Sequence, residues 1–216
     1  MTEKFHTELD ALKRDMMEMG RLATGMLRDA IRALKERDAG LARNVQARKK
    51  ELAEWDDRIE DRALKLIALH QPVASDLRTL ACILKMDTYL ARVGRYGKDI
   101  AQVAEELAEK PHLAKLVSIP HMSEVAAGMV EDALRAFESC DLSLLKDFSE
   151  KDDALDAQRW AIFRECVTYM MEDPKNITQC AHYIMVAKYL ERVADHACKM
   201  AEKIHYMVTG ERIEIK

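Results

Sequence analysis

The sequence is poor in the residues that make tight turns, with only 7 glycines and 4 prolines in 216 residues. A sandwich or barrel of many short strands needs frequent turn residues, so this composition excludes both. No run reaches the roughly 18 to 20 apolar residues that span a bilayer. Residues 1–5 contain no apolar stretch typical of a secretory signal. We therefore expect a cytoplasmic protein.

A disulfide pattern and an excess of positive charge are also absent. The five cysteines are an odd number and form no C-x-x-C pair, so we expect reduced thiols inside helices, not disulfides. The formal net charge is −4, and no stripe of lysine and arginine is present. Binding to nucleic-acid phosphates needs a concentrated basic surface, so a nucleic-acid partner is excluded.

The residues that are abundant favour helices. Leucine, alanine, glutamate, lysine, arginine and 13 methionines dominate the chain. Apolar residues recur at spacings of three and four nearly throughout, which is typical of helices packed side by side. The sequence predicts an all-α fold with six helices, near residues 3–37, 40–70, 73–109, 121–139, 142–172 and 174–208.

Several boundaries between these helices are marked by proline. Gln71-Pro72 ends one predicted helix and starts the next, with Pro72 expected in the first turn. Asp173-Pro174 marks the last boundary, and Asp173 is a candidate N-cap. A break across residues 110–120 separates the two halves.

The two halves are copies of one unit. Residues 25–33 (GMLRDAIRA) match residues 128–136 (GMVEDALRA), and residues 89–93 (YLARV) match residues 189–193 (YLERV). Shared glycine, aspartate, arginine and tyrosine within such runs indicate duplication rather than chance. We predict two tandem three-helix bundles, residues 1–110 and 111–216.

The second half carries two acidic pairs. Asp152 and Asp156 are four residues apart on one predicted helix, and Glu191 and Asp195 are four apart on the next. This spacing places both members of a pair on one helix face. Four carboxylates brought together would suit a hard cation such as iron, manganese, magnesium or calcium.

Asp152 stands out because it occupies an apolar seam, between Phe148 and Leu155. A carboxylate in such a position needs a partner, because burying an unpaired charge is costly. The partner could be a metal ion or a lysine or arginine of a neighbouring helix. Acidic pairs with this spacing are also common on solvated helix faces, so spacing alone leaves both interpretations open.

The first half keeps only one of the two pairs. Asp56 and Glu60 correspond to Asp152 and Asp156, whereas Ala91 and Arg95 replace Glu191 and Asp195. Two ligands are lost and a fixed positive charge is gained, so no metal is expected there. We expect Arg95 to neutralise Asp56 and Glu60 in place of metal, or alternatively to pair with a nearby acid such as Asp99.

Two further segments make the sequence resemble a known family. Residues 66–78 (LIALHQPVASDLR) and residues 189–197 (YLERVADHA) are similar to segments of the PhoU family, and the resemblance covers essentially the whole chain. It implies two three-helix bundles with E/D-x-x-x-D motifs that bind multinuclear metal clusters. By position, these motifs fall on Asp152, Asp156, Glu191 and Asp195, with iron as the first choice of metal and manganese or magnesium as alternatives.

The resemblance also implies a role and partners. It implies a homodimeric regulator that represses the phosphate-starvation response by binding the ATPase of a phosphate ABC transporter and a membrane sensor histidine kinase. Association with a membrane would occur only through those partners.

Two other classes of protein stay open at this point. No catalytic constellation is present, so we do not expect an enzyme. A metal-free helical scaffold would use the same carboxylates only in ion pairs. A carboxylate-bundle metalloenzyme would need paired E-x-x-H motifs, which the sequence lacks. His196, next to Asp195, is a weaker candidate for an additional ligand.

Overall fold

The computed structural model describes residues 3–113 and 118–215, and this part of the chain is almost entirely helical. The elements are α1 (Glu3–Glu36), α2 (Ala39–Ala47), α3 (Lys49–His70), α4 (Ala74–Leu107), α5 (Ser118–Ser139), η1 (Leu142–Leu145), α6 (Phe148–Glu172), η2 (Pro174–Asn176) and α7 (Ile177–Thr209). The predicted all-α fold is confirmed. Among the described residues, none of these helices is both long enough and apolar enough to cross a bilayer.

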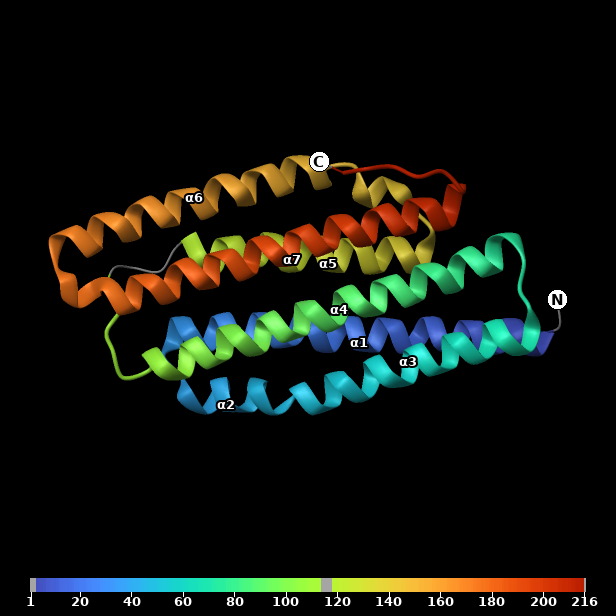
Figure 1. The fold of residues 1–216 in the computed structure, drawn as a ribbon, viewed down its shortest axis with the longest axis horizontal. Coiled ribbons are helices and arrows are strands. Elements are labelled where there is room, and N and C mark those ends of the chain that lie inside the picture. Colours follow the sequence, from blue (N-terminus) through green and yellow to red (C-terminus); the bar gives the residue numbers. More distant parts are fainter. Residues whose placement is uncertain (1–2, 114–117, 216) are drawn as a thin grey trace.

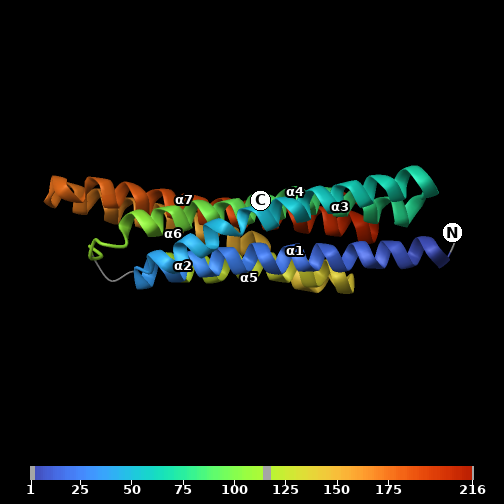
Figure 2. The same ribbon diagram turned by 90° about the horizontal axis from the view of Figure 1, so that it is seen from below.

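The long helices form two layers in an elongated molecule (Figures 1 and 2). One layer contains α3, α4, α7 and α6, and the other contains α1 and α5. Each half of the chain is a bundle: α1 and α3 pack against α4, and α5 and α6 pack against α7. The halves join where α4 lies along α7 and α1 along α5, so the predicted pair of three-helix bundles is confirmed as one packed body.

Aromatic rings mark the contact between α4 and α7. Tyr96 stacks on Tyr189 with ring centroids 5.5 Å apart, and Tyr89 stacks on His196 at the same distance. Tyr96 and His196 also stack on each other at 5.9 Å. Tyr89 corresponds to Tyr189, and Tyr96 to His196, in the internal duplication, so the two contacts exchange equivalent positions.

The cysteines follow the expected pattern in the helices. All five are free thiols, four of them are buried, and Cys140 is exposed beside the end of α5. The buried thiols act as small core residues.

One predicted helix, residues 40–70, is wrong as a single element. The chain breaks at Arg48, whose N–H donates to the carbonyl of Val45 (3.1 Å), so the last turn of α2 is tightened. The Arg48 guanidinium donates to Asn44 Oδ1 (2.9 Å) and lies 2.8 Å from Asp29 Oδ2 of α1. The apolar period continues across the break, and for this reason the sequence pattern did not reveal it.

The start of the fifth predicted helix is also corrected. Residues 142–145 form the 3₁₀ turn η1, capped by Asp141, whose side chain accepts a hydrogen bond from the Ser143 N–H (2.9 Å). The α-helix α6 begins only at Phe148. The local cap therefore outcompetes a continuous helix from residue 142.

The proline boundaries agree in part with the prediction. α3 ends at His70, and Gln71 adopts a left-handed conformation (φ 46°) with its N–H donating to Ile67 O (3.0 Å). Pro72 precedes α4 and does not lie in its first turn, contrary to the prediction. Asp173 is an N-cap as predicted, but of η2, and its side chain accepts from the Lys175 N–H (2.9 Å).

The packing of α1 on α4 depends on a close backbone approach at Gly97. A Cβ atom at this position would lie 2.9 Å from the backbone of both Met26 and Leu27. Real Cβ atoms do not approach backbone so closely, so any larger residue would push α1 and α4 apart.

We therefore predict that Gly97→Ala lowers the free energy of unfolding by about 1–3 kcal/mol through overpacking. Gly25→Ala on α1 is the matched control, because its added methyl group meets no atom within 4 Å. That substitution should raise stability by about 0.5–1 kcal/mol through helix propensity. Urea unfolding of the two variants measures both effects, and equal effects of the same sign would contradict the close approach.

Candidate metal centre

The hairpin of α6 and α7 brings the two predicted acidic pairs together. Asp152 and Asp156 lie on α6, and Glu191 and Asp195 lie on the antiparallel α7 that packs against it. The turn η2 connects the two helices directly, so their registers are fixed by a short connection. The negative charges of Asp156, Glu191 and Asp195 act on Asp152 within this helix pair.

Asp152 is partly buried. Burial, together with the negative charges of Asp195, Asp156, Asp153 and Glu191, raises its pKa to about 6. Its carboxylate therefore lacks enough positive charge nearby, although it occupies the seam that the sequence assigned to an apolar residue. This is the electrostatic signature of a cluster that a cation would stabilise.

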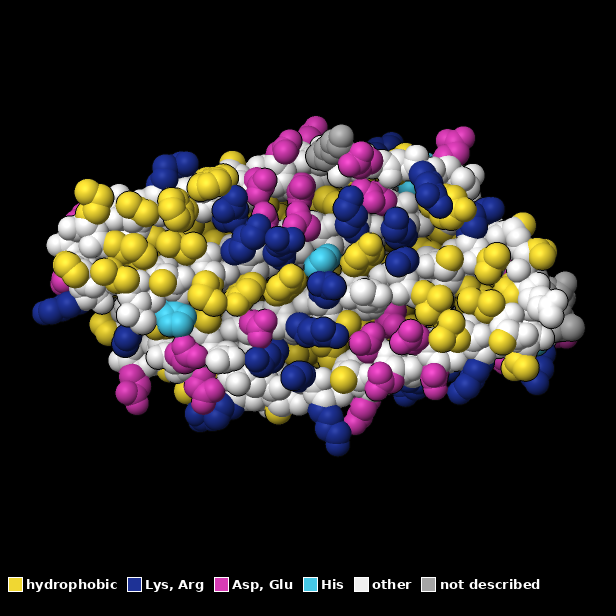
Figure 3. Space-filling view, viewed as in Figure 1, with side chains coloured by type: hydrophobic (Ala, Val, Ile, Leu, Met, Phe, Trp, Pro, Cys, Tyr) yellow, Lys and Arg dark blue, Asp and Glu magenta, His cyan; other side chains and the backbone are white. Residues whose placement is uncertain are grey.

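Basic side chains nevertheless border the cluster. Lys188 Nζ donates to both carboxylate oxygens of Glu191, at 2.6 and 2.5 Å. Arg159 Nε lies 3.7 Å from Asp156 Oδ1 and 3.9 Å from Glu191 Oε1. Figure 3 shows acidic and basic side chains side by side over the middle of this face, with hydrophobic side chains toward both ends.

With Lys188 paired to Glu191, the charge of that carboxylate is balanced by an ion pair. In the part of the chain that the structure describes, no three aspartate, glutamate, histidine or cysteine side chains are arranged as a ready-made metal site. The Lys188 side chain is 42% exposed, so it can turn toward solvent and free Glu191. The donor set, four carboxylates on two facing helices, fits a hard cation in chemistry.

His196 faces away from the four carboxylates. Its ring stacks on Tyr89 and Tyr96 of α4. Burial, together with a smaller contribution from Arg92, lowers its pKa to about 4. Its buried Nε2 has no hydrogen-bond partner. It belongs to the junction between the halves, consistent with its position one residue, or about 100°, beyond Asp195.

Cys198 is a neighbour that the sequence interpretation missed. Burial raises the pKa of its thiol strongly, and the charges of Asp152 and Asp195 raise it further. Its Sγ lies 4.0 Å from the carbonyl oxygen of Phe148. It follows Asp195 by three residues on α7, and this spacing could have indicated that the two side chains share a helix face.

The site at the equivalent place in the first half is made of different residues. Arg95 of α4 lies 3.8 Å from Asp56 Oδ2 of α3. This agrees with the predicted pairing with Asp56, and the pairing with Glu60 stays a prediction. Asp99, the alternative partner, pairs instead with Lys98 at 3.1 Å. A shallow cavity of about 330 Å³ lies here, and Asp56, Ala91, Arg95 and Lys49 are among the residues that line it.

One more acid of the first half, Asp87, was not identified from the sequence. Asp87 of α4 is 3% exposed, and burial together with Asp56, Glu60 and Asp57 raises its pKa to about 8. It precedes Ala91 by one helical turn. The sequence does contain a hint of this acid. Asp87, Ala91 and Arg95 follow one another at intervals of four on α4, so an acid lies one turn before the position where the second half has Glu191.

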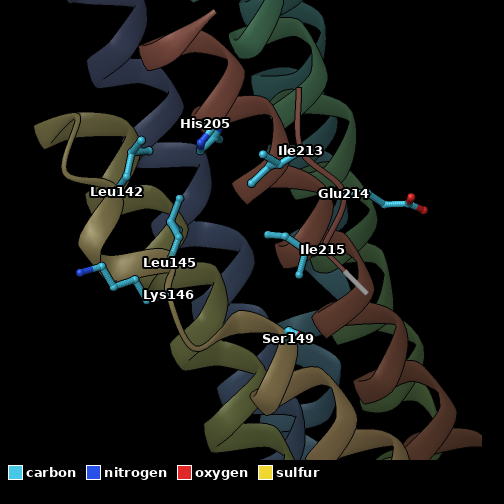
Figure 4. Close-up of a pocket in the computed structure, with 8 residues that line it drawn as sticks. All are labelled: Leu142, Leu145, Lys146, Ser149, His205, Ile213, Glu214 and Ile215. Atoms are coloured by element: carbon cyan, nitrogen blue, oxygen red, sulfur yellow. The ribbon is translucent and has the colours of Figure 1, made fainter. Parts of the chain in front are cut away.

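Another cavity, of about 470 Å³, lies between η1, α7 and the C-terminal segment (Figure 4). Leucine and isoleucine side chains line its walls, and it contains none of the predicted site residues. It therefore adds no ligand to the acidic cluster.

The duplicated helices and the acidic hairpin can now be compared with known proteins. Residues 16–104 and 119–204 each match the PhoU domain. The chain belongs to the PhoU family. Each matched copy lies within one of the two halves that the internal repeat defines.

Relatives in the PhoU family match along almost the whole chain. The Caulobacter vibrioides protein named phosphate-specific transport system accessory protein PhoU homolog is 38% identical over 212 residues, covering 98% of this chain and 92% of that protein. The Rhizobium meliloti protein of the same name is 38% identical over 207 residues, covering 95% and 87%.

Solved PhoU structures share the fold. The crystal structure of PhoU from Pseudomonas aeruginosa superposes with a TM-score of 0.92 at 33% identity, covering 96% of this chain and all of that chain. The phosphate transport system regulatory protein PhoU from Streptococcus pneumoniae gives 0.88 at 26% identity, covering 97% and 99%.

The raised pKa of Asp152 generates a prediction for the metal-free chain. A folded pKa of about 6, against an ordinary 3.8, means that the protonated carboxyl contributes stability fully below pH 3.8 and loses it as pH rises through 6. Asp152→Asn should therefore raise the free energy of unfolding in EDTA by about 1 kcal/mol at pH 7, after discounting for partial exposure, and have little effect at pH 4.

Glu172→Gln, an exposed acid at the far end of α6, about 30 Å from Asp152 along the helix, is the control and should leave this pH dependence unchanged. Chemical unfolding at the two pH values measures it. A loss of stability in Asp152→Asn at pH 7 would show instead that Asp152 is held by an ion pair.

Proposed function

We propose that this PhoU protein regulates phosphate uptake and phosphate-starvation signalling by binding the ATPase of a phosphate ABC transporter and a membrane sensor histidine kinase. The observation that carries the proposal is the match along 98% of the chain to a phosphate-specific transport system accessory protein. Because the match spans both halves, the role is assigned to the whole chain. The proposal includes a cytoplasmic location and a homodimer.

The surface supports a role in binding rather than in catalysis. Large apolar side chains are exposed near the tips of both helical hairpins, including Leu69 and Val73 at one tip and Met171 and Ile177 at the other. The two tips lie at opposite ends of the elongated body (Figure 1). Exposed apolar groups with charged residues between them are typical of protein contact surfaces.

We further propose that Asp152, Asp156, Glu191 and Asp195 hold one or more metal ions, with iron preferred and manganese or magnesium as alternatives. A bound cation would neutralise the cluster and link α6 to α7. The raised proton affinity of Asp152 supports this proposal, because the same surplus of negative charge that favours a proton favours a metal. The Lys188–Glu191 contact supports the competing metal-free scaffold.

Metal content per chain distinguishes the metal-binding cluster from the metal-free scaffold. We predict bound metal in protein purified without chelator, and its loss in the double variant Asp156→Ala, Asp195→Ala. Elemental analysis of both proteins measures the difference. The pair Asp57→Ala, Asp61→Ala, two exposed acids on α3, is the matched control and should leave the metal content unchanged. Absence of metal from wild type after reloading with iron, manganese and magnesium would establish the scaffold.

The partners are tested by pull-down with purified transporter ATPase and, separately, with the kinase in detergent. We predict that wild type retains both, and that Met171→Glu with Ile177→Glu weakens retention by at least about tenfold, because two anchors are lost from the contact surface. The control is Glu172→Gln, an exposed residue on the same tip. Failure of wild type to bind either protein would contradict the regulatory role.

A further inference from the structure

Asp87 is a buried acid that the proposed metal centre does not use. Its side chain is 3% exposed, and Oδ1 is fully buried without a hydrogen-bond partner. The repeat-equivalent residue in the second half is Ala187, so the duplication does not account for an acid here. A buried polar atom without a partner is costly, and its retention needs an explanation.

The acids that act on Asp87 come from the neighbouring helix α3. Asp56 lies within hydrogen-bonding reach, and Glu60 and Asp57 add their negative charges. Tyr89, two residues further along α4, stacks on His196 of α7. Two residues correspond to about 200° around a helix, so the charges of α7 face the opposite side of α4 from Asp87.

Positive charge near this cluster is limited. Arg95 lies 3.8 Å from Asp56 Oδ2 with its own side chain 62% exposed. Arg62 of α3 is paired with Asp15 of α1. Lys49, which is exposed, lines the same cavity as Asp56 and Arg95. In the described part of the chain, two solvent-facing cations, Arg95 and Lys49, therefore stand against the carboxyl groups of Asp56, Glu60 and Asp87.

Two carboxyl groups within hydrogen-bonding reach cannot both be ionised without strong repulsion. A proton between them removes the repulsion and makes one carboxyl a donor to the other. We propose that Asp56 and Asp87 bind one proton between them across the α3–α4 contact. That proton, together with Arg95, supplies the positive charge that the metal ion proposed above would supply in the second half.

The titration of Asp87 agrees with this geometry. Burial and the three acids of α3 raise its pKa to about 8, so the pair holds a proton at neutral pH. The pair titrates as one unit, because its two members interact strongly. The two halves would then respond to different species: protons at the α3–α4 contact and metal ions at the α6–α7 contact.

The sign of the pH dependence follows from the raised pKa. The contribution of the protonated pair to stability is fully present below pH 3.8 and is lost as pH rises through about 8. Within that range each pH unit lowers the ratio of folded to unfolded chain by up to about tenfold.

The test measures unfolding from pH 5 to 9 in the Asp156→Ala, Asp195→Ala background, so that metal in the second half does not contribute. Asn in place of Asp87 keeps the shape and the donor but carries no charge. Relative to Asp87→Asn, the parent should become less stable by about fiftyfold in the folding equilibrium between pH 6 and pH 8. Asp99→Asn, a half-exposed acid on the same helix, is the control and should follow the parent.

Two further measurements keep the proposal falsifiable if Asp87→Asn folds poorly. Carboxyl ¹³C NMR of the parent chain should show one aspartate that is still protonated at pH 7. Titration with Mn²⁺ or Ca²⁺ at pH 8 should not stabilise the parent more than Asp87→Asn. No protonated aspartate at pH 7, or selective stabilisation by either cation, would overturn the proton pair.

Discussion

The fold depends on the burial of apolar stripes along its long helices, above all where α4 lies between α1 and α7. Each long helix carries buried residues every three or four positions, and the backbones of α1 and α4 come so close at Gly97 that no side chain fits between them. This packing fixes the rotation of α4 and α7 about their axes. As a result, positions 87, 91 and 95 face α3, and positions 191 and 195 face α6.

Each hairpin uses the same geometry to bring carboxylates together, and each balances their charge differently. In α6–α7 the charges of neighbouring acids act on Asp152, and Lys188 and Arg159 lie beside Glu191 at ion-pair distances. In α3–α4 the two acids of α3 meet Arg95 and the buried Asp87. Because one fold supports both arrangements, the halves could diverge in these charged residues without losing their packing.

Much of the fold could be predicted from the sequence, because helical periodicity and internal repetition are long-range signals that a few local exceptions do not disturb. The break at Arg48 and the 3₁₀ start at residue 142 were missed, because they depend on hydrogen bonds from Arg48 and Asp141 that leave the apolar period unchanged. The four acids of the second half were placed by their spacing. Lys188 and Asp87 were missed because side-chain rotamer and burial decide their roles.

The ring contacts between α4 and α7 have a consequence for how this architecture arose. Tyr96 contacts Tyr189 while Tyr89 contacts His196, so equivalent positions contact each other reciprocally. Reciprocal contacts of this kind define an isologous interface, which a two-fold symmetric dimer of identical subunits forms. A single ancestral three-helix unit carrying this surface would have paired with itself, and fusion of two copies made that dimer permanent within one polypeptide.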